Sequence, residues 1–132
     1  MKYTEQAAHA LHDSARQFQL SGAELLADYG AVMRWCNGIG ADWMPDCMTA
    51  LCTKLNGVME VPAAIHDLRY IYNVDRLSAD TEFLANTLRV IELTYAWYNP
   101  MRYIMRKRAE RYYTYLRTFG GVAWEEAKKK QP

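Results

Sequence analysis

Apolar residues recur along this chain at intervals of three and four, the spacing of one face of an α-helix. In the N-terminal part the pattern predicts helices over residues 3–18 and 23–35, the second capped by Ser21, and a short helix over residues 46–55. No stretch alternates apolar and polar residues as a half-buried strand would. The sequence therefore predicts an all-α fold.

The C-terminal part has the same period. It predicts a helix over residues 62–73 that begins at Pro62, a second helix capped by Ser78 and ended by Asn99–Pro100, and a last helix over residues 101–119 that ends at two glycines. The last helix should bury Ile104, Met105, Tyr112, Leu116 and Phe119 and expose Arg102, Arg106, Glu110 and Arg117. Because the turn after the first of these helices is short, we expect an antiparallel helix hairpin over residues 62–98.

The length of 132 residues fits one compact domain that buries roughly two-thirds of the surface of its unfolded chain. We expect it to consist of N-terminal helices (1–36), a glycine loop (37–45), the hairpin (62–98), and a basic helix with its tail (101–124). With 51% apolar and 23% charged residues, the composition excludes a disordered chain.

The net charge of +1 conceals an asymmetry. Residues 1–101 contain 7 Lys and Arg against 12 Asp and Glu, whereas residues 102–132 contain 9 against 3. The basic helix can meet phosphate-bearing partners, or it can neutralise the acidic remainder of the same molecule. Composition leaves both alternatives open.

Three cysteines, an odd number without a C-x-x-C spacing, argue against a disulfide framework and a structural zinc site. The first residues lack the apolar core of a secretory signal, and no run approaches the ~20 apolar residues of a membrane span. We expect no transmembrane segment and a cytoplasmic location.

The pair His66–Asp67 stands within an otherwise apolar helical segment, with Tyr70 one turn later and Asp80 early in the next helix. A histidine that takes a proton from water needs a carboxylate that stabilises the imidazolium, and a residue across the hairpin can supply it. The alternative is a core histidine paired with an acid for structural reasons alone.

A neighbouring carboxylate points about 100° round the helix from His66, so Asp67 can instead face a loop and bind a hard cation. The backbone carbonyls of the glycine loop, at Gly38 and Gly40, are candidates for the remaining oxygen ligands. These glycines can equally do no more than end a helix.

Four segments together resemble one family. AAIHDLRY (63–70) and SADTEF (78–83) are similar to the HD-x-x-Y and A-D-x-x-F pattern of small phospholipase A2-like domains of bacteriophages and parvovirus capsids. NGIGADWMP (37–45) and RAERYYTYLRTFGGVAW (108–124) resemble the loop and the basic tail of the phage-borne relatives. The similarity extends over residues 36–124.

The resemblance implies a calcium-dependent lipase site, in which calcium polarises the ester carbonyl. The implied roles are His66 as the base, Asp80 as the residue that orients it, Tyr70 as support, and Asp67 with the carbonyls of Gly38 and Gly40 as calcium ligands. The chain departs from secreted relatives in having Pro62–Ala63 where they have two cysteines. Asp80 also follows His66 by only 14 residues, so Asp75 is a possible substitute partner.

A phage-derived phospholipase A2-like hydrolase is the first functional hypothesis. Its partner would be a phospholipid membrane surface, with Trp43, Arg102 and Arg106 at the interface. The alternative is a catalytically inactive phage protein of the same fold that binds a phage or host protein, in virion assembly or against a host factor. Nucleic acid is not an expected partner, because no recognition motif is present. The expected location is the host cytoplasm, with the virion as a second one.

Overall fold

The computed structural model describes residues 2–36, 57–72 and 74–130, and these residues form helices, turns and no strand. The elements, in chain order, are α1 (Glu5–Gln17), η1 (Ala23–Ala27), α2 (Tyr29–Trp35), η2 (Gly57–Met59), α4 (Glu60–Ile71), α5 (Arg76–Thr94) and α6 (Pro100–Lys129), where η denotes a 3-10 helix. The predicted all-α class is confirmed for the described residues. The glycine loop and the short helix expected over residues 46–55 lie outside them.

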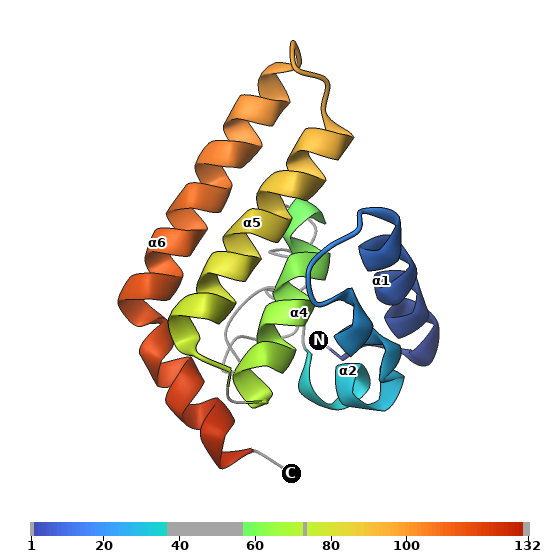
Figure 1. Cartoon of the computed structure of the whole chain (residues 1–132), viewed down its shortest axis with the longest axis vertical. Helices are drawn as coiled ribbons and strands as arrows, with labels where there is room; N and C mark the ends of the chain where they lie inside the picture. Colours follow the sequence, from blue (N-terminus) through green and yellow to red (C-terminus); the bar gives the residue numbers. More distant parts are fainter. Residues whose placement is uncertain (1, 37–56, 73, 131–132) are drawn as a thin grey trace.

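Helix α4 occupies the centre of the arrangement (Figure 1). Helices α4 and α5 run in opposite directions, and α6 returns along α5, while α1, η1 and α2 lie on the other side of α4 (Figure 1). Eight residues of α4 are buried. Because a helix that is apolar nearly all round must be covered on all sides, the composition of α4 explains its central position.

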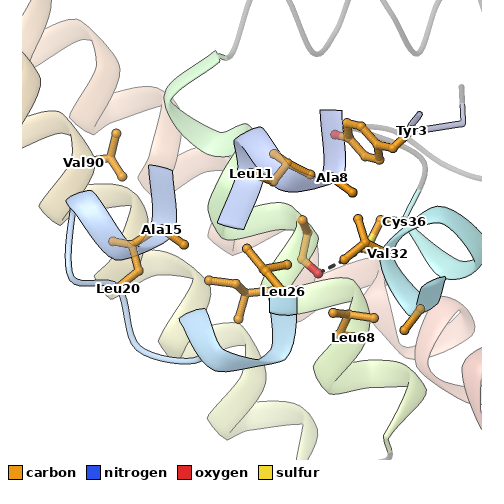
Figure 2. Close-up of a cluster of buried hydrophobic side chains, with 13 residues drawn as sticks. Tyr3, Ala8, Leu11, Ala15, Leu20, Leu26, Val32, Cys36, Leu68 and Val90 are labelled. Atoms are coloured by element: carbon orange, nitrogen blue, oxygen red, sulfur yellow. Dashed lines mark hydrogen bonds between the residues drawn. The ribbon is translucent and has the colours of Figure 1, made fainter. Parts of the chain in front are cut away.

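The largest apolar cluster lies between α4 and the N-terminal helices (Figure 2). Leu26 from η1 and Val32 from α2 meet Leu68 from α4, and all three are fully buried. The thiol of Cys36 donates a hydrogen bond of 3.5 Å to the carbonyl oxygen of Ala64 in the same region (Figure 2). On its other side α4 packs through Ala63 against Phe83 of α5 and Leu116 of α6.

The helix expected over residues 23–35 is divided in two at Asp28. The Asp28 carboxylate accepts a hydrogen bond of 3.0 Å from the backbone N–H of Ala31 and so caps α2, which separates it from η1. Ser21 is not a cap. Its hydroxyl donates instead to the Glu82 carboxylate at 2.7 Å, and Gly22, with φ of 86°, precedes η1.

The predicted ends of the C-terminal helices also need correction. α4 begins at Glu60, two residues before Pro62, and α5 begins at Arg76 with Asp75 as its cap instead of Ser78. α6 continues through Gly120 and Gly121 to Lys129 instead of ending there. A Cβ atom at Gly120 would lie 3.1 Å from the Tyr70 hydroxyl, so this glycine permits close packing and does not terminate the helix.

Two side chains of α6 that the period assigned to the core, Ile104 and Phe119, are exposed. The reason is that α6 packs on one side only, through Met105, Ala109 and Leu116. None of the helices in the described ranges is long and apolar enough to span a membrane.

Candidate functional site

A fully buried carboxylate, that of Asp80, lies where α4, α5 and α6 meet. Its position in the second turn of α5 directs it toward both neighbouring helices. His66 and Tyr70 approach it from α4, and Arg117 approaches it from α6. The site is thus built from three helices, and His66 and Tyr70 share a face of α4 because they are four residues apart.

The imidazole of His66 is 2.7 Å from Asp80, measured from Nε2 to Oδ1. An ionised carboxylate only accepts hydrogen bonds, so Nε2 carries the proton and, in the neutral ring, Nδ1 carries the lone pair. His66 is 6% exposed, and its ring centroid lies 4.2 Å from that of Tyr70 and 5.6 Å from that of Phe83. These contacts fix the orientation of the ring.

Two further donors complete the surroundings of Asp80. The Tyr70 hydroxyl donates to Oδ1 at 2.6 Å, and Nη1 of Arg117 donates to Oδ2 at 2.7 Å. Burial opposes ionisation of Asp80, but the hydrogen bonds from His66, Tyr70 and Arg117 outweigh it, and the pKa of Asp80 is lowered. Asp80 is therefore ionised at neutral pH.

The contact with Asp80 also shifts the pKa of Tyr70. Burial, and then the hydrogen bond to Asp80, raise the pKa of the Tyr70 hydroxyl, which keeps it a donor.

A second arginine lies beside the carboxylate. Nε of Arg76 lies 3.9 Å from Asp80 Oδ2, and Nη2 of Arg76 donates to the carbonyl oxygens of Leu116 and Arg117 at 2.7 and 2.9 Å. Arg76 thereby ties the backbone of α6 to the start of α5, next to the carboxylate.

The structure brings together His66, Asp80 and Tyr70 as the sequence analysis expected, but not Asp75. The Asp75 carboxylate accepts hydrogen bonds of 3.0 Å from the backbone N–H and the hydroxyl of Ser78, so it caps α5 and does not substitute for Asp80. Arg117, expected to be an exposed surface residue, is part of the site and 33% exposed. The R-x-F-G-G pattern around it was the one signal in the sequence that singled it out.

Asp67 lies on the other side of α4 from Asp80. Burial is the main reason that the pKa values of Tyr3 and Cys36 are raised, and the charge of Asp67 raises both further, which places this carboxylate toward the N-terminal helices. Within the part of the chain that the structure describes, no group of three or more His, Cys, Asp or Glu residues could hold a metal ion.

Calcium takes six to eight oxygen ligands, so the single carboxylate of Asp67 does not by itself make a calcium site. The other expected ligands, the carbonyls of Gly38 and Gly40, lie outside the described residues, as does Trp43. The described residues alone therefore do not fit a calcium ion.

The two arginines expected at a membrane interface lie near the start of α6, away from His66. Arg106 precedes Arg117 by 11 residues, which corresponds to about 16 Å along a helix. Arg102 and Arg106 together line a surface hollow beside Trp97 and Tyr98. The site around Asp80 and this hollow are separate features.

No family model, no curated protein and no solved structure matches this chain. The fold and the site define an all-helical protein with a buried His–Asp–Tyr cluster. An arginine covers one side of this cluster.

Proposed function

We propose that this protein is a phage-derived phospholipase A2-like hydrolase that cleaves phospholipid esters with His66 as its general base. The observation that carries the proposal is the 2.7 Å contact between His66 Nε2 and the buried, ionised Asp80. This contact leaves Nδ1 as the basic nitrogen, which is what proton abstraction from water requires. The likeness of the segments around His66 and Asp80 to phospholipase A2-like domains supplies the substrate class.

In the proposed reaction Nδ1 of His66 takes a proton from a water molecule while the water oxygen attacks the ester carbonyl carbon. The negative charge of Asp80 stabilises the imidazolium that forms, and Tyr70 and Arg117 hold the carboxylate in place. When the ester C–O bond breaks, the imidazolium returns the proton to the departing alkoxide of the lysophospholipid. The products are a fatty acid and a lysophospholipid, and His66 is neutral again.

Calcium dependence belongs to the proposal through the resemblance alone. Asp67, with the carbonyls of Gly38 and Gly40, is the ligand set that the resemblance suggests. The experiment therefore treats calcium as a variable.

A catalytically inactive protein of the same fold, acting by binding another phage or host protein, is the second candidate. The observation in its favour is that both oxygens of Asp80 are hydrogen-bonded to side chains of the two neighbouring helices, α4 and α6, as expected of a structural centre. In that case His66 contributes to stability only.

The test compares fatty-acid release from phosphatidylcholine and phosphatidylglycerol vesicles, with and without millimolar calcium, alongside melting temperatures. The variants are His66→Ala and Asp67→Asn, and His9→Ala is the matched control because His9 is an exposed histidine outside the site. We expect wild type and His9→Ala to release fatty acid, and His66→Ala to lose 10²- to 10⁴-fold in rate, the usual contribution of a general base.

Loss of calcium-dependent release in Asp67→Asn, with the melting temperature retained, would support the calcium ligand. If wild type releases no fatty acid from either lipid at any calcium concentration while His66→Ala melts at a much lower temperature, the hydrolase proposal is wrong and the structural role remains.

A further inference from the structure

The turn between α5 and α6 exposes an unusual set of side chains. We call residues 93–106 the hairpin tip; in Figure 1 they form the top of the structure, beyond the upper end of α4. Trp97 is 83% exposed and Tyr98 is 73% exposed, with their rings edge to face at 5.6 Å between centroids. The other exposed large apolar side chains of the tip are Leu93, Met101, Tyr103 and Ile104.

A hollow of about 440 Å³ lies on the hairpin tip, and the residues that line it include the aromatic residues Trp97, Tyr98 and Tyr103 and the cations Arg102 and Arg106. The ammonium group of Lys107 lies over the Tyr103 ring, 5.5 Å from its centroid. Aromatic rings and cations are therefore interleaved on one surface.

The charge of this region has one sign. Residues 93–106 include two cations, Arg102 and Arg106, and no Asp or Glu, while Lys107, directly after the tip, pairs with the Glu110 carboxylate at 3.4 Å. Since Arg102 and Arg106 line the hollow together with three aromatic residues, an anionic partner with an apolar interior is complementary to the surface.

We propose that the hairpin tip binds the surface of an anionic lipid bilayer. Trp and Tyr favour the boundary between headgroups and acyl chains, and Arg pairs with the phosphates just outside it. The exposed aliphatic side chains of Leu93, Met101 and Ile104 favour a bilayer over a nucleic acid, because they gain from hydrocarbon and gain nothing from a phosphate backbone. Insertion of the tip places them at that boundary.

This attachment is independent of the proposed hydrolysis. The distance along α5 from Asp80 to Thr94 is 14 residues, or about 21 Å, so binding at the tip does not involve His66. The attachment holds the protein at a membrane whether or not the site around Asp80 is catalytic.

The experiment measures binding of the full chain to vesicles by sedimentation, without calcium. The vesicles are phosphatidylcholine alone or phosphatidylcholine mixed with phosphatidylserine. Two variants test the two components of the tip: Trp97→Ala/Tyr98→Ala removes the rings, and Arg102→Gln/Arg106→Gln removes charge. Phe119→Ala and Arg34→Gln are matched controls, since both residues are exposed and lie outside the tip.

Wild type and both controls should bind the mixed vesicles, and added salt should weaken the binding. Each arginine lost should weaken binding about fivefold, and loss of the two rings should weaken it about tenfold or more. His66→Ala should bind as wild type does, which separates a failure of this proposal from a failure of the hydrolase proposal.

The proposal is overturned if wild type does not bind the mixed vesicles, if the tip variants bind as tightly as the controls, or if the tip variants lose binding to a single-stranded oligonucleotide but not to vesicles. Melting temperatures equal to that of wild type verify that both tip variants fold.

Discussion

Replacing Asp80 by Asn tests the buried carboxylate at the junction of α4, α5 and α6. The amide keeps one oxygen, which can still accept from His66 and Tyr70, but it presents an N–H group to the guanidinium of Arg117 in place of Oδ2. Two charge-assisted hydrogen bonds become neutral ones, and a third is lost. The backbone and the side-chain volume hardly change, so the effect isolates the charge.

The magnitude follows from the strength of such bonds. A hydrogen bond to an ionised group stabilises a protein by about 1.5–3 kcal/mol, and a neutral one by about 1 kcal/mol, so each of the two retained bonds loses about 1 kcal/mol. The bond from Arg117 adds little to this sum, because its side chain is 33% exposed and water solvates the freed guanidinium. We expect a total loss of about 2 kcal/mol, or about 7 °C in melting temperature.

Urea and thermal unfolding at pH 7 measure this loss, with Asp13→Asn, an exposed residue of α1, as the matched control that should change stability by less than about 0.5 kcal/mol. The pH dependence supplies a second readout. The pKa of Asp80 is lowered by folding, so its ionisation stabilises the protein above the usual Asp pKa of about 3.9, and this stabilisation is lost as pH falls through the lower folded value.

The difference between wild type and Asp80→Asn should therefore shrink below about pH 4. A loss below about 1 kcal/mol at pH 7, or a difference that stays unchanged at low pH, would refute the argument.

Two further substitutions test the packing. Leu26→Ala should cost about 2–5 kcal/mol in urea unfolding because Leu26 is fully buried, whereas Leu77→Ala, exposed at the start of α5, should cost less than about 0.5 kcal/mol; similar losses would contradict the core assignment. Gly22→Ala should destabilise by about 1–3 kcal/mol, since Gly22 has φ of 86° and a Cβ atom there would lie 2.6 Å from Cγ2 of Ile65. Gly57→Ala, whose Cβ meets nothing within 4 Å, is its control, and equal melting temperatures for the two variants would contradict the strain argument.

The hydrophobic period predicted the helical class and the positions of most helices, because each helix buries one face. The period did not predict correctly where the helices begin and end. Asp28 divides an expected helix, and Asp75 starts α5 three residues before the expected cap at Ser78, because a capping carboxylate competes with other polar residues for the same N–H groups. Gly120 was expected to end α6, but its lack of a side chain accommodates Tyr70 of another helix. Contacts of this kind are tertiary and leave no periodic signal.

The site was partly predictable. A histidine in an apolar segment requires a polar partner, and the hairpin was expected to bring Asp80, or Asp75 as a substitute, near it. The role of Arg117 was not predictable from period, which assigned it to the solvent face of α6. The Arg117 side chain is long enough for Nη1 to reach Oδ2 of the buried carboxylate at 2.7 Å while the side chain stays 33% exposed.

The most direct test of the account supplies wild-type protein with phosphatidylcholine labelled either in the sn-1 or in the sn-2 acyl chain, at millimolar calcium, and follows the free fatty acid. The account predicts that label is released from the sn-2 position only, in proportion to the protein added, and that His66→Ala releases at least 10²-fold less. No release from the sn-2 position by wild type, or undiminished release by His66→Ala, would contradict it.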